Sequence, residues 1–194
     1  MDGGKPGGSL GVARSRRKAR EAALRALYQM EIARTIAKEA GEDMKLHSDL
    51  PDDLKEFADG LVHHYAIHKA LIDEKISSLI KDWDYKRVAV VDRCILRIAA
   101  VELFYEPGIP PAVTINEAIE IAKKYSTADS GKFVNGVLGN LLKDSPKVNW
   151  DPSMETRPEV PDEPPIAEPE PEAVTEEEAK EIMKVGMWKV RDED

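Results

Sequence analysis

The sequence contains a single cysteine, Cys94, among its 194 residues. One thiol cannot form an intrachain disulfide, which excludes the disulfide frameworks of small secreted proteins and favours a reducing compartment. No segment approaches the roughly 18 consecutive apolar residues that a membrane-spanning helix requires. The glycine-rich N-terminus also lacks the apolar region of a signal peptide. We therefore expect a cytoplasmic protein without membrane association.

Recognisable catalytic motifs are also missing from the sequence. Ser130-Gly131-Lys132 lacks the upstream glycine of a phosphate-binding loop and follows no predicted strand. His64 and His68 have a spacing that suits metal binding, but no nearby carboxylate or cysteine completes a ligand set, so we interpret them as paired surface histidines. The sequence contains no dinucleotide fingerprint and no zinc-protease helix either. These absences favour a binding protein over an enzyme, with no cofactor and no metal.

Acidic and basic residues are unevenly distributed along the chain. Residues 151–194 contain 15 of the 37 acidic residues but 5 of the 28 basic ones, so this segment accounts for the net charge of −9. The net charge of the preceding residues is close to zero. The acidic net charge of the whole chain is therefore compatible with a locally basic surface that binds nucleic acid. The charge split motivates the hypothesis that the acidic tail occupies such a surface in the same chain.

Composition divides the chain into three parts. Residues 1–13 form a glycine-rich segment that we expect to be disordered. Residues 14–147 have the apolar periodicity of a folded helical domain. Residues 148–194 form an acidic, proline-rich tail that we expect to be flexible, because its few apolar residues cannot offset the entropy of ordering. Its terminal Met187 and Trp188 are interpreted either as a short docking motif or as a remnant without function.

The first predicted helix begins with a cluster of basic residues. Five of the seven residues from Arg14 to Arg20 are basic, directly before the apolar stripe of Ala19, Ala23, Leu27 and Met30. With Ser15 as its cap, the helix would have a cationic first turn, which is unfavourable for the helix dipole by about several tenths of a kcal/mol. This placement indicates either a polyanionic partner or a solvated helix start.

The middle of the chain is predicted to form further helices. Gly41 is expected to end the first helical region, and Pro51 to open the next helix. Another helix is expected through residues 71–80, and the most apolar one through residues 87–105, where it would lie at the centre of the core. Arg93 and Arg97 on this central helix are expected to pair with acidic residues elsewhere in the fold.

Residues 114–142 are predicted to form two amphipathic helices joined by a polar turn. Thr114 and Glu117 have the spacing of a capping box for the first helix. Asp129 or Ser130 is expected to cap the second, whose core stripe would be Val134, Val137, Leu138 and Leu141. Phe133 falls to one side of this stripe, beside Lys132 and Asp129, which is an unusual position for an aromatic ring with a simple packing role.

Three blocks of this sequence resemble the landmarks of the NusB family of bacterial transcription antitermination factors, in the same order. They are RRKAREAALRALYQME, VDRCILRIAAVEL and NEAIEIAKKYSTADSGKFVNGVLGNLL, and the resemblance covers about residues 14–143. It implies an all-α fold of two packed helical bundles. It also implies a transcription antitermination factor that binds boxA-type single-stranded RNA together with NusE, a ribosomal small-subunit protein, and supports rRNA transcription. Other Nus factors and RNA polymerase would be indirect partners.

The resemblance also implies roles for individual residues. Those on the RNA side would be Arg16, Arg17, Lys18, Asp129, Lys132 and Phe133, and those toward NusE would be Tyr28 and Asp92. Their chemistry suits these roles, since basic side chains and helix-start N–H groups hold phosphates, a phenyl ring stacks on a base, and a carboxylate accepts hydrogen bonds from a base edge. Structural roles remain open, with Asp129 as a helix cap and Tyr28 as an aromatic at the core edge. Gly131 removes a side chain beside Lys132, and with it any contact that relatives make there.

Two other functions remain open. The first is a helical protein-interaction or self-association module, in which the basic start docks on an acidic partner without RNA. The second, an accessory domain of an RNA methyltransferase, is disfavoured because no catalytic domain follows. The sequence leaves the oligomeric state open, a homodimer included. The RNA-binding hypothesis requires the fold to bring the basic start of the first helix beside the turn that carries Lys132 and Phe133.

Overall fold

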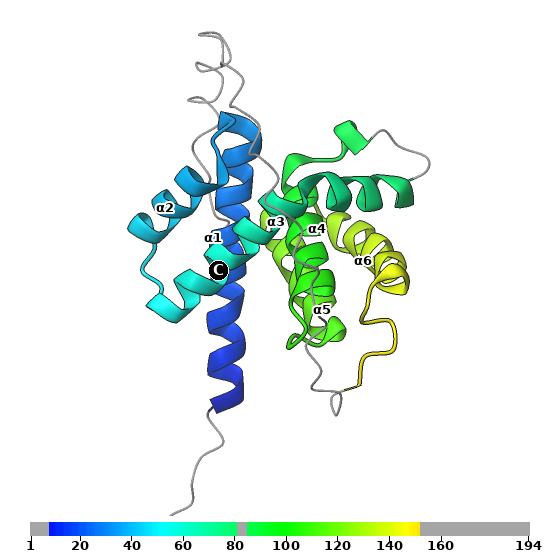
Figure 1. Ribbon diagram of the computed structural model, residues 1–194. Helices are drawn as coiled ribbons and strands as arrows, with labels where there is room; N and C mark the ends of the chain where they lie inside the picture. The colour runs from blue at the N-terminus through cyan, green and yellow to red at the C-terminus, as the bar shows by residue number, and fades with distance from the viewer. Residues whose placement is uncertain (1–7, 81–84, 152–194) are drawn as a thin grey trace, which may run out of the picture.

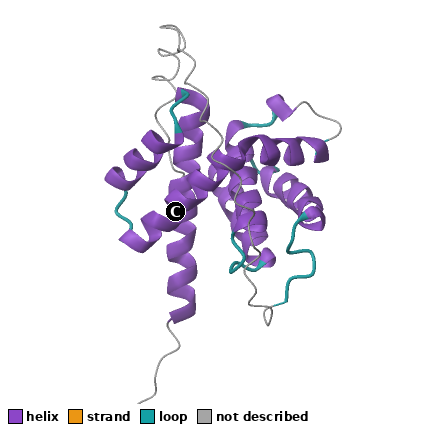
Figure 2. Ribbon diagram, viewed as in Figure 1, coloured by secondary structure: helices purple, strands orange, loops and turns teal. Residues whose placement is uncertain are grey.

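The computed structural model describes residues 8–80 and 85–151, with side chains from Arg16 onward. Within these residues the chain forms six α-helices, two short 3-10 helices and no strand, as Figure 2 shows, so the predicted all-α class is confirmed. None of the described helices is long and apolar enough to cross a membrane. The elements are α1 (Gly8–Ala33), α2 (Ala37–His47), α3 (Asp52–Leu79), η1 (Tyr85–Arg87), α4 (Val90–Tyr105), α5 (Pro111–Tyr125), α6 (Ser130–Leu141) and η2 (Leu142–Asp144).

The helices pack as two groups that share α3 (Figure 1). The first half of α3 packs with α1 and α2, and its second half lies with α4, α5 and α6. The two halves meet at a kink at His68, whose backbone angles are φ −103° and ψ 15°. The separate helix predicted through residues 71–80 is therefore the second half of α3. This arrangement confirms the expected pair of packed helical bundles.

The imidazole of His68 is buried beneath α4 at this kink. Its ring stacks on Tyr105 with centroids 4.0 Å apart and planes 9° from parallel, and the ring of His64 lies 6.0 Å from the same tyrosine. The interpretation of His64 and His68 as paired surface histidines is therefore wrong for His68, which is 8% exposed. His64 and Tyr105 are half-buried, and the contacts among these three rings account for the four-residue spacing.

Two helix boundaries differ from the predicted ones, at the start of α1 and at Gly41. The first helix begins at Gly8, ahead of the expected Arg14, so Ser15 lies within it and is not its cap. It ends at Ala33, followed by Arg34 in the left-handed conformation with φ 55°. Gly41 does not end this region, because it lies inside α2, where a Cβ atom would collide with the carboxylate of Asp59 on α3.

Helix α4 is the centre of the core, as predicted, although it begins at Val90 after the short η1 helix. All residues from Asp92 to Leu103 are buried. They pack against apolar side chains of α1, α3 and α6, among them Leu24, Leu61, Ile72, Leu138 and Leu141. Burial raises the pKa of the Cys94 thiol to about 12, so this thiol stays protonated and unreactive at neutral pH.

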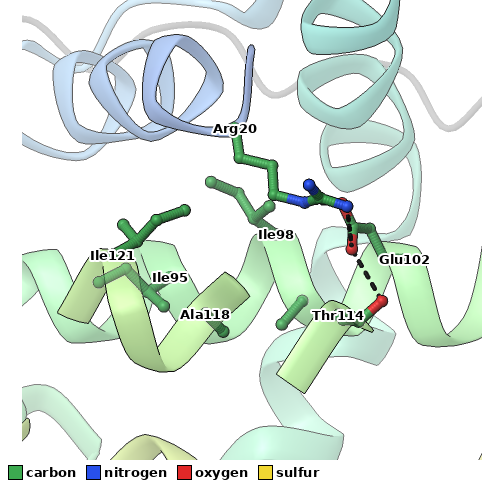
Figure 3. A pocket seen from close by; sticks show the side chains of 8 residues that line it. Arg20, Ile95, Ile98, Glu102, Thr114, Ala118 and Ile121 are labelled. Carbon is green, nitrogen blue, oxygen red and sulfur yellow. Dashed lines mark hydrogen bonds and ion pairs between the residues drawn. The ribbon is translucent and has the colours of Figure 1, made fainter. Parts of the chain in front are cut away.

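The predicted capping box at Thr114 and Glu117 is not formed. Helix α5 begins three residues earlier, at Pro111, and the Thr114 hydroxyl donates a 2.8 Å hydrogen bond to Glu102 of α4. Glu102 also accepts a 2.5 Å hydrogen bond from Arg20 of α1 (Figure 3). The cavity beside these residues measures about 10 Å³, which is at most the space of one water molecule, so it cannot hold a ligand. Glu102 therefore joins α4 to α1 and α5, and Thr114 does not cap a helix.

The folded part continues past α6 to a lysine that closes the end of α4. The buried Lys147 amine donates hydrogen bonds to the carbonyl oxygens of Glu102, Glu106 and Ile109, at 2.5–2.6 Å. It thereby satisfies carbonyl groups that the end of a helix leaves without partners. The N-terminal residues 1–7 and most of the expected acidic tail, residues 152–194, lie outside the described residues.

Candidate nucleic-acid interface

Helix α5 lies between the two regions that the sequence assigns to RNA. On one side, Arg17 of α1 donates two 2.7 Å hydrogen bonds to the carboxylate of Glu117. Lys124, two turns further along the same side of α5, bonds Glu21 of α1 at 3.2 Å. On the other side, the backbone of α6 at Gly131 lies against the side chain of Lys123. The basic start of α1 and the start of α6 therefore both pack on α5.

The side of α5 between these two contacts faces the solvent. At about 100° per residue, the exposed residues fall between the line that faces α1 and the line that faces α6. They are Asn116 and Glu120, and the exposed Lys123 and Lys124 lie at the two edges, toward α6 and α1 respectively. The starts of α1 and α6 with this side of α5 form one face, which we call the three-helix face. The predicted regions lie within it, separated by the width of one helix.

The three basic residues predicted on α1 point in different directions. Arg17 is 39% exposed and held by Glu117, so part of its guanidinium edge reaches the solvent. Lys18 is exposed, on the side of the helix next to α5. Arg16 is also exposed, but its guanidinium carbon lies 5.3 Å from the ring centroid of Phe57 on α3, away from α5. Lys18 therefore extends the three-helix face, and Arg16 lies at its far edge.

Three of the predicted residues lie at the start of α6. Asp129 is in the N-cap position and exposed, and its side chain makes no capping hydrogen bond, so its carboxylate oxygens are available to a ligand. Lys132 is exposed, as the helical periodicity predicts. Phe133 is half-buried, with one part of the ring against the core and the remainder accessible. The predicted core stripe of α6 is confirmed by the burial of Val134, Val137, Leu138 and Leu141.

The two residues predicted to face a protein partner differ in accessibility. Tyr28 is half-buried at the edge of the core, three residues before Glu31, which bonds Arg93 of α4. Asp92, the neighbour of Arg93, is 6% exposed, and its Oδ2 accepts a 2.9 Å hydrogen bond from the Ser130 hydroxyl of α6. The structure thus brings Asp92 to the start of α6 but turns its carboxylate inward, and it leaves Tyr28 partly accessible on α1.

The sequence analysis missed Lys123 and Lys124, which lie on the α5 part of the three-helix face, on the sides toward α6 and α1. Their hydrogen bonds keep the local charges fixed at neutral pH. The bond from Lys123 lowers the pKa of Glu120, and although burial works to lower the pKa of Lys124, its bonds to Tyr125 and Glu21 raise it. The sequence offered one signal for these residues, two adjacent lysines directly before the polar turn. It could not show that they lie near α1, because their proximity to α1 depends on tertiary packing.

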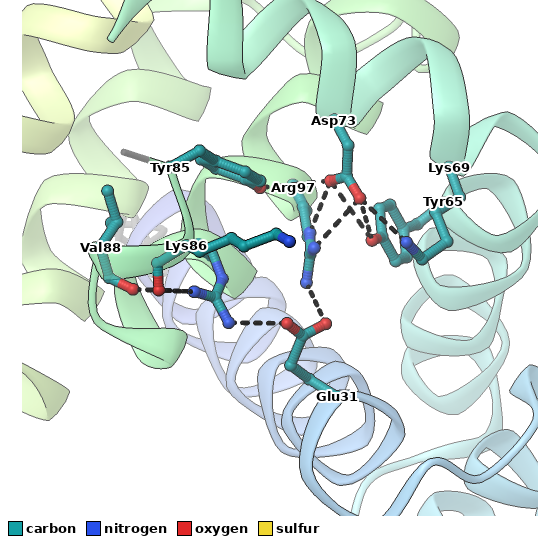
Figure 4. Close-up of polar contacts among 9 residues, drawn as sticks. Glu31, Tyr65, Lys69, Asp73, Tyr85, Lys86, Val88 and Arg97 are labelled. Carbon is teal, nitrogen blue, oxygen red and sulfur yellow. Dashed lines mark hydrogen bonds and ion pairs between the residues drawn. The ribbon is translucent and has the colours of Figure 1, made fainter. Parts of the chain in front are cut away.

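A second group of charged residues lies on another part of the molecule (Figure 4). Arg97 bonds Asp73 of α3 at 2.8 and 3.1 Å and Glu31 of α1 at 2.9 Å, and Arg93 bonds Glu31 at 2.6 Å. The predicted pairing of Arg93 and Arg97 is therefore confirmed. The adjoining cleft, about 590 Å³, is lined by these mutually paired groups. Among the described residues no group of three or more side chains is arranged to hold a metal ion. This cluster joins α1, α3 and α4.

Comparison with known proteins places these features in a family. The sequence profile of the NusB family matches residues 17–143. Transcription antitermination protein NusB of Methylacidiphilum infernorum (isolate V4) is 46% identical over 140 residues, which cover 70% of this chain and 96% of that protein. The protein of the same name from Bacillus thuringiensis (strain Al Hakam) is 44% identical over 126 residues, 65% of this chain and 95% of that relative.

Solved structures agree with the sequence relatives. T. maritima NusB superposes with a TM-score of 0.64 at 39% identity, covering 70% of this chain and 96% of that one. A crystal structure of the antitermination factors NusB and NusE in complex with dsRNA gives a TM-score of 0.62 at 28% identity, covering 68% of this chain and 98% of that one. With the family profile spanning most of the described helices and relatives above 40% identity, this chain belongs to the NusB family.

Proposed function

We propose that this protein is a transcription antitermination factor that binds boxA-type single-stranded RNA together with NusE and supports rRNA transcription. The observation that carries the proposal is the three-helix face, with exposed lysines on all three helices and a half-exposed phenyl ring at the start of α6. The similarity to a NusB that was crystallised with NusE and dsRNA supports the same partners. Other Nus factors and RNA polymerase would join through this assembly.

The chemistry of the three-helix face suits a single strand. Lys18 and Lys132 can neutralise phosphates directly, and Lys123 and Lys124 can do so by sharing their bonds to Glu120 and Glu21. The N–H groups at the start of α6 add a favourable dipole. The accessible part of Phe133 can stack on a base that is not held in a duplex. Asp129, whose carboxylate has no capping bond, can accept hydrogen bonds from the edge of such a base. Of the two residues that the family resemblance assigns to NusE, the half-buried Tyr28 would meet it.

A binding titration tests this function. A fluorescently labelled boxA-type oligonucleotide is titrated with the full chain, with and without NusE, beside a scrambled oligonucleotide of the same length. We expect the boxA-type strand to bind more tightly than the scrambled one, and NusE to increase the difference. Equal binding of both strands with and without NusE would contradict the proposal. NusE binding that excess RNA leaves unchanged would instead support the protein-interaction module.

The salt dependence of that titration tests the lysines. Each lost phosphate contact on a single strand reduces the slope of log K against log salt concentration by about 0.7. We expect this reduction for Lys123→Ala and for Lys132→Ala. Lys38→Ala in α2 is the matched control, because Lys38 is exposed on a helix outside the three-helix face. A slope that changes as much in Lys38→Ala as in the other two variants would contradict the assignment of this face.

A further inference from the structure

A cluster of hydroxyl groups connects the α5–α6 turn to the buried carboxylate of Asp92. The Ser130 hydroxyl lies 2.9 Å from Asp92 Oδ2, 2.9 Å from the Ser126 hydroxyl and 2.9 Å from the Thr127 hydroxyl. It also accepts a 3.2 Å hydrogen bond from the backbone N–H of Thr127. Ser130 is itself 3% exposed, whereas Ser126 is half-buried and Thr127 is exposed, so the cluster runs from the buried carboxylate to the surface of the turn.

The hydrogen bonds of the cluster have a defined direction. An ionised carboxylate can only accept, and a serine hydroxyl has one hydrogen to donate. The Ser130 hydrogen therefore points to Asp92, the stronger, charge-assisted acceptor. The Thr127 N–H occupies one of the two lone pairs of the Ser130 oxygen, so one hydroxyl, that of Ser126 or that of Thr127, can donate to the other. Bonds that point the same way along such a chain strengthen one another. The carboxylate of Asp92 thus orients the whole turn from the first turn of α4.

Asp92 has no other described partner that would share this role. Its second oxygen, Oδ1, is buried and accepts no hydrogen bond from the residues that the structure describes. Loss of the Ser130 hydroxyl would leave both oxygens without a donor. The geometry also opposes a direct contact between this oxygen and a protein partner, because Oδ1 is not accessible from the surface.

We infer that Asp92 and Ser130 are positioning residues for RNA, acting as one unit that fixes the α5–α6 turn. This inference rests on the proposed RNA-binding function and changes the role that the family resemblance gives to Asp92. Asp129 directly precedes Ser130, and Lys132 and Phe133 follow within the first turn of α6. The hydrogen bond from Ser130 to Asp92 sets the position of all three relative to α5. Asp92 therefore acts on RNA through the turn and does not contact NusE.

Substitution of each residue tests the unit. We expect Ser130→Ala and Asp92→Ala each to weaken boxA-type RNA binding about tenfold, as for the loss of one charge-assisted hydrogen bond. The double variant should be no weaker than either single one, because both remove the same bond. Asp92→Asn, which keeps an acceptor for the Ser130 hydroxyl, should retain more RNA affinity than Asp92→Ala. Additive losses in the double variant would overturn the inference.

Two further measurements separate positioning from a general loss of stability. Amide hydrogen exchange should speed up from Thr127 to Phe133 in Ser130→Ala, with the amides of α3 and α4 unchanged. Ser145→Ala is the matched control, since it removes a buried hydroxyl beyond the other end of α6, about 18 Å along this 12-residue helix. Faster exchange throughout the molecule, or equal RNA loss in Ser145→Ala, would overturn the positioning role.

Binding of NusE without RNA separates this inference from the proposed function. We expect Asp92→Asn to bind NusE as the unchanged chain does, because Asp92 is enclosed. Loss of NusE affinity in Asp92→Asn, with RNA affinity intact, would show a direct partner contact and overturn the inference alone. Failure of the unchanged chain to bind either boxA-type RNA or NusE would instead overturn the proposed function, whatever the exchange data show.

Discussion

At the residue scale, charged side chains in this protein divide into those held by other helices and those left for a ligand. Arg17 is held by both of its bonds to Glu117, whereas Lys18 and Lys132 are exposed. A group already paired within the protein gains less from a phosphate, because it must share or give up its existing partner. We therefore expect the exposed lysines to contribute more to RNA affinity than Arg17.

Phe133 gives the first prediction at this scale. Phe133→Ala should weaken boxA-type RNA binding by about 1–3 kcal/mol through loss of base stacking. Since part of the ring packs on the core, some stability should also be lost. Phe104→Ala is the control, because Phe104 is also half-buried but lies near the end of α4. Titration of both variants at a temperature where both are folded checks this, and normal RNA binding by Phe133→Ala would remove the stacking role.

Asp73 gives a prediction about pH. Burial works to raise the pKa of Asp73, but the hydrogen bond and charge of Arg97 outweigh burial and hold the pKa below its ordinary value. Ionised Asp73 therefore stabilises the folded chain above the ordinary carboxyl pKa of about 4, and this contribution is lost as the pH falls through the lowered folded-state pKa. The free energy of unfolding should differ between the unchanged chain and Asp73→Asn by a constant amount near neutral pH.

Denaturant titrations of both proteins at several pH values measure this difference. It should shrink as the pH is lowered below about 4, where unfolded-state carboxylates become protonated. Glu74→Gln provides the control, since Glu74 is the exposed neighbour of Asp73 on α3. A difference that grows on acidification would mean that Arg97 does not hold Asp73 in its ionised form.

At the element scale, α5 and the end of α4 have the largest consequences. Helix α5 separates and positions the two regions that bind RNA in the proposal, through Glu117 on one side and Lys123 on the other. The end of α4 is closed by Lys147, which follows the last residue matched by the family profile, residue 143. The folded domain of this chain thus includes a contact from just beyond the residues that the family profile matches.

Lys147→Met tests the contribution of this contact. Methionine keeps the length of the side chain but removes the amine, so three carbonyl groups lose a charged donor. We expect the free energy of unfolding to fall by about 1–3 kcal/mol, from denaturant titration. Lys143→Met is the control, because the Lys143 amine bonds the exposed side chain of Asn140. Equal stability of the two variants would show that the end of α4 does not depend on Lys147.

Much of the fold could be predicted at this scale, for identifiable reasons. The core stripe of α6 follows from a 3.6-residue repeat of apolar residues, and the central place of α4 follows from its high apolar content, both of which the sequence displays directly. The helix ends were harder, because Gly41 and Thr114 have local signals for a helix stop and a cap. Both signals were overridden by contacts with distant residues, Asp59 and Glu102, which no local pattern reveals.

At the scale of the whole molecule, the exposed lysines of the three-helix face and the excess of acidic residues lie in different parts of the chain. The described helices carry the three-helix face, and residues 151–194 carry 15 acidic and 5 basic residues. A tethered segment of this length has a high effective concentration, of the order of millimolar, at any surface it can reach. The hypothesis that the tail competes with RNA for the three-helix face rests on this charge difference alone, and it concerns residues that are mostly outside the described part.

Truncation after Trp150 tests this hypothesis. Removal of the acidic residues should tighten binding to RNA, and most strongly at low salt, where electrostatic attraction is least screened. A chain in which the acidic residues of 151–178 are replaced by Gln or Asn is the matched control for length. It should bind RNA as the truncated chain does. Unchanged RNA affinity in both proteins would remove the autoinhibitory role of the tail.

The candidate site was only partly predictable from the sequence, because its position depends on how three helices pack. Local patterns were sufficient to select Lys132, Phe133 and Asp129 at the start of α6. They could not reveal that α5 lies between α6 and α1, or that Lys123 and Lys124 lie on the sides of α5 toward these two helices. The inward orientation of Asp92 was likewise hidden, since it depends on a hydroxyl 38 residues away in the sequence.

Amide hydrogen exchange of the full chain, with and without boxA-type RNA in the presence of NusE, tests the central claim most directly. The account predicts that RNA slows exchange in three separate segments, at the start of α1, along the second half of α5 and from Thr127 to Phe133. The residues of α2 and those around Arg97 should exchange at the same rate with and without RNA. Slower exchange at α2 or around Arg97, with the three-helix face unchanged, would contradict the account.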